Sequence, residues 1–181
     1  ADCRFSYRSS VFKEDLKDQY VIYSVSFRLN RETDVKIEYA SLANALKGFP
    51  EKKITPELVS KKVCEIRSSK LPSPSKLGNA GSFFWNPVIS TEEFSRLQKS
   101  FPNIVAYPNG DKVKLAAAWL IEQAGWKGYR KGDVGVHKDH ALVLGNYGLG
   151  TGEQLVALSE QIQSSIQDKF GISLTPEVRI I

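Results

Sequence analysis

The stretch from Gly78 to Pro87 reads GNAGSFFWNP and combines small residues with side chains that can do chemistry. Glycine and alanine let a backbone approach a ligand closely, while Ser82 and Asn86 add a hydroxyl and an amide. The Ser82 hydroxyl could act as a nucleophile, as an acid or only as a hydrogen-bond donor. No GxSxG elbow surrounds it, so hydrolase chemistry is poorly supported. This stretch therefore predicts a ligand-binding loop.

Two further patterns look like ligand sites but have simpler explanations. The glycines between Gly145 and Gly152 match neither GxGxxG nor a P-loop, which favours a plain connection over a dinucleotide site. If residues 136–144 are extended, the odd separation of His137 and His140 places their rings on opposite faces. No carboxylate or cysteine joins them at ligand spacing, so we expect no metal site, although either histidine could contact a ligand.

The composition is that of a globular domain. The chain has 181 residues, of which 41% are hydrophobic and 25% charged, and this argues against disorder. No apolar run approaches the ~20 residues needed to cross a bilayer, so we expect no membrane segment. The net charge of +5 favours anionic partners, but no nucleic-acid-binding motif accompanies it, and we expect no nucleic acid. The chain contains no methionine, and we expect it to be part of a longer protein.

Capping signals and apolar spacing predict a mixture of helices and strands. Cap residues Thr55, Ser90 and Thr151 each precede a helical pattern. The predicted helices cover residues 41–47, 55–69, 90–101, 114–124 and 151–170, and the predicted strands cover 20–29, 35–39, 141–144 and 172–181. The first two strands could form a hairpin, and the proline- and glycine-rich stretch 71–81 is expected to be irregular. The pattern indicates an α+β fold.

Six segments that together span almost the whole chain carry a family resemblance. They read CRFSYRSSVFK (3–13), RSSKLPSP (67–74), GNAGSFFWNP (78–87), KLAAAWLIEQAGWKG (114–128), VHKDHALVLGN (136–146) and FGISLTPEVRII (170–181). In this order they resemble the UDP-N-acetylenolpyruvoylglucosamine reductases, bacterial flavoenzymes of peptidoglycan synthesis. The resemblance implies a cytoplasmic protein. Tyr39 suggests the type of the family in which a tyrosine-bearing insertion covers the substrate.

The resemblance also implies how the chain is organised. The family's N-terminal half, whose glycine-rich loops hold most of the FAD, has no counterpart in this sequence. Residues 1–54 then correspond to the remnant of a flavin-binding α+β domain, and residues 55–181 to an α+β substrate-binding domain. FAD and NADPH are the implied cofactors, and an N-terminal fragment of the same enzyme is the implied partner. The alternative is an inactive UDP-sugar-binding fragment that lacks the flavin-binding half.

The implied reaction is the reduction of UDP-N-acetylglucosamine enolpyruvate. NADPH reduces FAD, the reduced flavin passes a hydride to the methylene carbon of the enolpyruvyl ether, and a proton completes UDP-N-acetylmuramate. Arg8 matches the arginine placed against the substrate carboxylate, where a permanently charged group suits a developing anion. Glu177 matches the carboxyl group at the same centre, and Ser82 matches the proton donor.

Five further residues match the family's substrate contacts. Lys70 matches a lysine at the diphosphate, while Tyr39, Asn86 and Tyr107 match contacts around the phosphates and the uridine. His140 stands where the family has a glutamine, and either side chain can hydrogen-bond.

Overall fold

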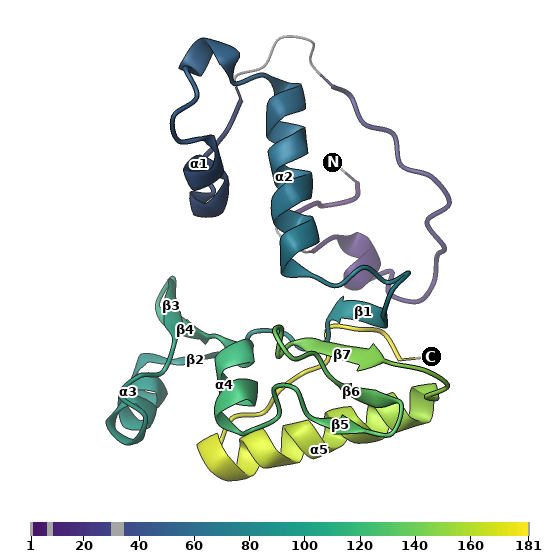
Figure 1. Ribbon diagram of the computed structural model, residues 1–181, viewed down its shortest axis with the longest axis vertical. Coiled ribbons are helices and arrows are strands. Elements are labelled where there is room, and N and C mark those ends of the chain that lie inside the picture. The colour runs from purple at the N-terminus through teal and green to yellow at the C-terminus, as the bar shows by residue number, and fades with distance from the viewer. Residues whose placement is uncertain (1, 7–8, 30–34, 181) are drawn as a thin grey trace. The chain divides into compact units, whose positions relative to one another are not determined.

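The computed structural model describes residues 2–6, 9–29 and 35–180, and the chain divides into two compact units, 1–36 and 37–181 (Figure 1). The α-helices are α1 (Ala40–Leu46), α2 (Pro56–Lys70), α3 (Thr91–Ser100), α4 (Ala117–Gln123) and α5 (Gly152–Phe170). The strands are β1 (Gly78–Ser82), β2 (Val88–Ser90), β3 (Ala106–Asn109), β4 (Lys112–Leu115), β5 (Arg130–Lys131), β6 (Val134–Val136) and β7 (Val143–Asn146). Short 3-10 helices cover Val11–Lys13 and Glu51–Lys53. These elements confirm the predicted α+β class. The predicted boundary between residues 54 and 55 concerns function and stays a prediction.

Two antiparallel sheets organise the second unit. The four-stranded sheet has the order β1-β7-β6-β5, and the three-stranded sheet has the order β2-β4-β3. In the first sheet Gly78 lies opposite Asn146, and in the second Tyr107 lies opposite Lys114. The sheets therefore bring residues from distant parts of the sequence next to each other.

Helix α5 covers the four-stranded sheet through contacts with β6 and β7. Its capping box is complete, because Thr151 accepts from the Gln154 backbone and the Gln154 side chain accepts from the Thr151 backbone. Gly171 ends the helix in the left-handed conformation, with φ at 69°. The helix buries Leu158, Ser159, Ile162, Ile166 and Phe170. The predicted helix is therefore confirmed at both ends.

The predicted helix 114–124 is wrong at its start. Lys114 and Leu115 belong to β4, and α4 begins only at Ala117. Leu115 donates its backbone N–H to Pro87 at 2.9 Å and is fully buried. Pairing with β2 and β3 thus determines the conformation of these residues, overriding their favourable helix propensity.

Three expectations about extended segments need correction. The stretch 71–81 is not irregular throughout, because its end forms β1 against β7. The predicted strand 141–144 is shifted to Val143–Asn146. The predicted strand 172–181 is not regular in its described part, where a single bridge joins Pro176 to Phe84. Each correction concerns a non-local partner, which local sequence does not specify.

The first unit differs most from expectation. Residues 20–29 form no strand, and their apolar side chains are exposed, with Val21 94% and Tyr23 98% accessible. Residues 35–39 form no strand either, and the predicted turn between the two segments lies outside the described residues. A strand needs a hydrogen-bonding neighbour, and no described segment pairs with residues 20–29. The β-branched and aromatic pattern of residues 20–29 is therefore not enough by itself to form a strand.

Candidate functional site

Ser82 is positioned by a bulge at the end of β1. The pairing of β1 with β7 is irregular between Asn79 and Ser82, and Gly81 has a φ of 75°. The Asn79 amide nitrogen donates to the backbone oxygens of Leu77 at 2.7 Å and Pro72 at 3.2 Å. Its carbonyl oxygen accepts from the Gly81 N–H at 2.9 Å. One side chain therefore fixes both the approach to β1 and the backbone just before half-buried Ser82.

The C-terminal segment brings Glu177 to the end of β1. Glu177 donates its backbone N–H to the Phe83 oxygen at 2.7 Å. One step earlier in this segment, Trp85 donates its N–H to the Thr175 oxygen at 2.9 Å. Residue 177 is thus hydrogen-bonded to the immediate neighbour of Ser82, so two of the three predicted catalytic residues lie on adjoining segments. The third, Arg8, lies outside the described residues.

Asn86 and Tyr107 both belong to the region around the three-stranded sheet. The Asn86 carbonyl oxygen accepts from the Ala117 N–H at 2.9 Å and so caps the start of α4. This bond uses the side-chain oxygen of Asn86, so the side-chain nitrogen is the group that can donate to a ligand. Tyr107 is 51% exposed on β3, directly opposite Lys114 of β4. Opposed residues of antiparallel strands project to the same face of the sheet, so Lys114 shares the face of Tyr107.

Lys114 is a candidate that sequence reasoning missed. The predicted helix 114–124 includes Lys114, and in that helix it would not lie opposite Tyr107. The structure places it between Val88 and Tyr107 in the middle strand of the sheet. The alternation of apolar and basic residues in KVKL was the available signal for a strand.

The remaining substrate-binding predictions lie on three other elements. Tyr39 directly precedes α1 and is 73% exposed. Lys70 is the last residue of α2, and its side chain is outside the described part of the structure. His140 is half-buried in the bend between β6 and β7. The structure does not by itself unite these side chains with Ser82.

The two histidine rings are stacked rather than directed to opposite faces. Residues 137–142 bend between β6 and β7, and the ring centroids of His137 and His140 are 5.0 Å apart at 16°. Burial lowers the pKa of His137, and the neighbouring His140 and Lys138 lower it further, while Asp139 opposes them. Neutral His137 is therefore favoured. Among the described residues, no group of three or more His, Cys, Asp or Glu side chains could hold a metal ion.

The glycine-rich connection between β7 and α5 is closed by its own hydrogen bonds. Gly148 and Gly150 both donate their N–H groups to the Asn146 side chain at 3.1 Å. Leu149 donates to the Asp133 carboxylate at 2.9 Å, and the N–H groups of residues 147 and 151 are also bonded within the protein. A phosphate cradle requires free N–H groups. The N–H groups of residues 147–151 are therefore not available to the diphosphate of FAD or of another dinucleotide.

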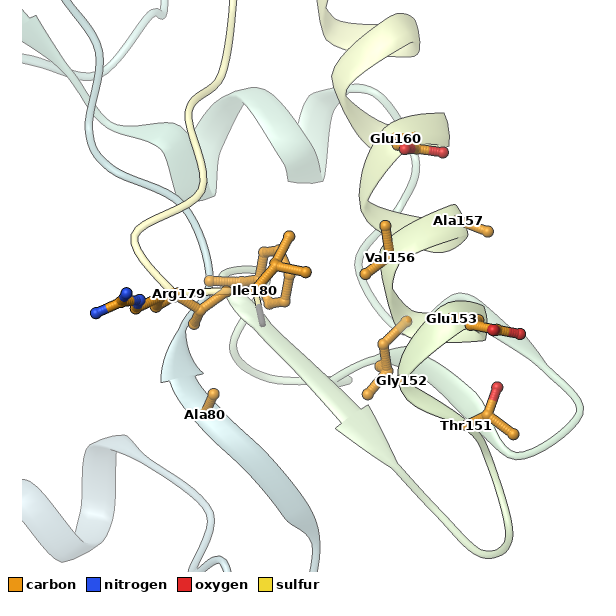
Figure 2. A pocket seen from close by; sticks show the side chains of 12 residues that line it. Ala80, Thr151, Gly152, Glu153, Val156, Ala157, Glu160, Arg179 and Ile180 are labelled. Atoms are coloured by element: carbon orange, nitrogen blue, oxygen red, sulfur yellow. The ribbon is translucent and has the colours of Figure 1, made fainter. Parts of the chain in front are cut away.

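A pocket of about 810 Å³ lies between the start of α5 and the C-terminal segment. Figure 2 shows Val156 and Ile180 pointing into it, while the carboxylates of Glu153 and Glu160 and the guanidinium of Arg179 point away. None of the residues that line it is a predicted site residue. The pocket presents an apolar surface and is poorly suited to a charged nucleotide.

No helix within the described residues is both long and apolar enough to cross a membrane.

Comparison with known proteins identifies the family. The model of the protein family described as UDP-N-acetylenolpyruvoylglucosamine reductase, C-terminal domain, matches residues 73–181. A UDP-N-acetylenolpyruvoylglucosamine reductase from Pseudomonas syringae pv. tomato is 49% identical over 177 residues, which are 97% of this chain and 52% of the relative. Proteins of the same name from Porphyromonas gingivalis and Chromobacterium violaceum are 50% and 47% identical, cover 99% and 100% of this chain, and are each matched over 53% of their own length.

The chain thus spans about half the length of the curated relatives that it matches. Identity near one half over essentially the whole chain, together with the matched C-terminal domain, leaves no doubt about common ancestry. The chain belongs to the UDP-N-acetylenolpyruvoylglucosamine reductase family.

Proposed function

We propose that this chain supplies the substrate-binding domain of a flavin-dependent reductase that converts UDP-N-acetylglucosamine enolpyruvate into UDP-N-acetylmuramate. The observation that carries the proposal is that the segments of two matched residues adjoin. Ser82 ends β1, and the neighbouring Phe83 accepts the Glu177 backbone N–H at 2.7 Å. A hydroxyl and a carboxyl group from distant parts of the sequence thus belong to adjoining segments, as one reaction centre requires.

The reaction adds a hydride and a proton across the carbon–carbon double bond of the enolpyruvyl ether. NADPH is the electron source, and FAD, when bound, carries the hydride to the substrate. The glycine-rich loop offers FAD no phosphate cradle between residues 147 and 151, because these N–H groups are hydrogen-bonded within the protein. The residues of this chain act on the substrate instead.

Ser82 is assigned the protonation step. Its hydroxyl gives a proton to the carbon that becomes the lactyl stereocentre, and the resulting alkoxide is then reprotonated by solvent. A serine hydroxyl is a weak acid, so it serves only against a strongly basic carbanion at contact distance. Glu177 and Arg8 act at the same centre, where the arginine pairs with the substrate carboxylate.

Substrate binding is assigned to Tyr39, Lys70, Asn86, Tyr107 and His140. The Asn86 amide nitrogen and the Tyr107 hydroxyl offer hydrogen-bond donors to the phosphates and the uridine. Lys114, which shares the sheet face of Tyr107, adds a positive charge beside that donor. A dianionic diphosphate is attracted to such a combination.

Binding is tested on the chain itself. Isothermal titration calorimetry with UDP-N-acetylglucosamine enolpyruvate is expected to show binding that weakens about fivefold in Tyr107→Phe, because one hydrogen bond is lost. Tyr23→Phe is the matched control, since it removes a fully exposed hydroxyl from the first unit. Absence of binding by the unsubstituted chain, or equal effects of both variants, would contradict this part of the proposal.

Protonation is tested in the complete enzyme loaded with FAD. Ser82→Ala is expected to leave bleaching of the flavin by NADPH unchanged and to slow product formation at least about 100-fold, as loss of a general acid does. Ser75→Ala removes an exposed hydroxyl from the loop before β1 and serves as the control. Product formation at the normal rate in Ser82→Ala would exclude Ser82 as the proton donor.

A second candidate function is binding of the UDP-sugar without its reduction. It is favoured by the glycine-rich loop, whose N–H groups at Gly148 and Gly150 are already bonded to Asn146 and are not available to FAD. Gel filtration of the chain after mixing with FAD tests whether these residues hold the cofactor. A colourless protein fraction that still binds the UDP-sugar is expected if the chain alone is a binding module, and a retained flavin spectrum would contradict the division into a flavin-binding half and this substrate-binding part.

A further inference from the structure

A second pocket, of about 350 Å³, lies beside the four-stranded sheet. Its walls come from four segments: the loop before β1, strand β5, the end of β6 and the residue after β7. The lining includes three basic side chains, Lys76, Arg130 and Lys138, together with the ring of Tyr147. We propose that this pocket binds the phosphate group of a small ligand, a function beyond the substrate contacts assigned above.

Arg130 is held in place before any ligand arrives. Its Nε donates to the Gly132 oxygen at 2.9 Å, and its guanidinium carbon lies 4.5 Å from the centre of the Tyr147 ring. A terminal nitrogen also lies 3.9 Å from an Asp133 carboxylate oxygen. Because the Arg130 side chain is already ordered, it loses little conformational entropy when a ligand binds. Its guanidinium fork also matches the geometry of phosphate oxygens.

Lys76 and Lys138 reach the pocket from different segments and add mobile charges. Both are exposed, and neither forms an ion pair with a described residue. Within the described part of the chain, Asp133 is the carboxylate that pairs with a basic residue of this cluster, and it also accepts a hydrogen bond from Leu149. The cluster is therefore positive overall, and its lysines have no carboxylate to displace when an anion binds.

His137 lies in the wall of the pocket and reports on its charge. Its Nδ1 accepts from the Asp139 N–H at 3.2 Å, which leaves Nε2 to interact with a ligand. The groups that act on this ring are Lys138, Asp139 and His140, and the pocket adds Lys76 and Arg130. Burial, His140 and Lys138 lower its pKa. A bound phosphate would favour the charged imidazole and raise that pKa.

The experiment is an NMR titration of the histidine side chains in the full chain. The chain has two histidines, so His137→Phe assigns both signals. Pyrophosphate is the probe, and saturation is expected to raise the pKa of His137 by about 0.5, the effect of one charge about 6 Å away through water. No binding of pyrophosphate at millimolar concentration, or binding without a change at His137, would overturn the proposal.

Matched variants separate the pocket from general charge attraction. Lys76→Ser and Lys138→Ser are each expected to weaken pyrophosphate binding about three- to tenfold, the loss of one charged contact near the surface. Lys99→Ser lowers the net charge equally on an exposed residue of α3 and is expected to change binding less than about twofold. An equal effect of Lys99→Ser would show diffuse attraction and overturn the assignment.

Competition identifies the source of the phosphate. If UDP-N-acetylglucosamine raises the pKa of His137 and displaces pyrophosphate, the site takes the diphosphate of a nucleotide-sugar. If pyrophosphate still binds in saturating UDP-N-acetylglucosamine, the site takes a separate phosphorylated ligand. Both results support the phosphate site, and neither depends on whether the chain takes part in the proposed reduction.

Discussion

Replacing Asn79 with alanine should test how β1 and Ser82 are held. The Asn79 side chain makes bonds of 2.7, 2.9 and 3.2 Å to Leu77, Gly81 and Pro72, and it is half-buried. Each such bond contributes about 0.5–1.5 kcal/mol net, and the freed N–H of Gly81 must also find a new partner. We therefore expect the free energy of unfolding of the second unit to fall by about 2–3 kcal/mol.

Urea unfolding followed by tryptophan fluorescence measures this change. Asn79→Asp keeps an acceptor for the Gly81 N–H but loses both donated bonds, so its loss should be intermediate. Ser73→Ala is the control, because the Ser73 hydroxyl lies in the same loop and bonds only to the exposed Ser75 hydroxyl at 2.8 Å. We expect the control to lose less than about 0.5 kcal/mol. If Asn79→Ala loses no more than the control, this side chain does not hold the strand.

Three other predictions follow from particular contacts. Gly135→Ala should lower the unfolding free energy by about 1–3 kcal/mol in a thermal melt, because a Cβ there would lie 2.6 Å from the backbone oxygen of Tyr129. Gly152→Ala, where no atom lies within 4 Å of the added carbon, should not destabilise the protein. Thr151→Ala should cost about 1 kcal/mol in urea unfolding through loss of the α5 cap, and Thr151→Ser should restore most of it. The pKa of His137 in the folded chain lies below its unfolded value of about 6.5, so the unfolded chain binds more protons near this pH. The free energy of unfolding should therefore fall as the pH drops below 6.5, and His137→Phe should reduce that fall.

The helices show how far local sequence signals reach. The caps Thr55, Ser90 and Thr151 each accept the hydrogen bond that their spacing predicts. A cap and a period of 3.6 residues involve neighbours within one turn, so the sequence contains all that is needed. Gly171 likewise ends α5 as predicted, because glycine tolerates a positive φ.

The strands were predicted less well, since each depends on a distant partner. Residues 20–29 have a strong strand pattern but no described partner, and they form no regular secondary structure and stay exposed. Gly78–Ser82 has a weak pattern but pairs with β7, so it forms a strand. Lys114 belongs to a predicted helix but pairs with Val88 and Tyr107 in β4, because its strand partners are also distant in sequence. Burial and cross-strand hydrogen bonds outweigh intrinsic propensity at these positions.

The sequence by itself determined the family, the helix ends and the residue types for the proposed chemistry, because motifs and caps are local arrangements. Only the tertiary structure decided which of these residues meet. It joined the segment of Glu177 to that of Ser82, stacked His137 on His140, and gathered the basic side chains of the second pocket. The first and the last of these arrangements link residues far apart along the chain, and the histidine stacking depends on the bend between β6 and β7. Their geometry follows from sheet register and packing, which no short stretch of sequence contains.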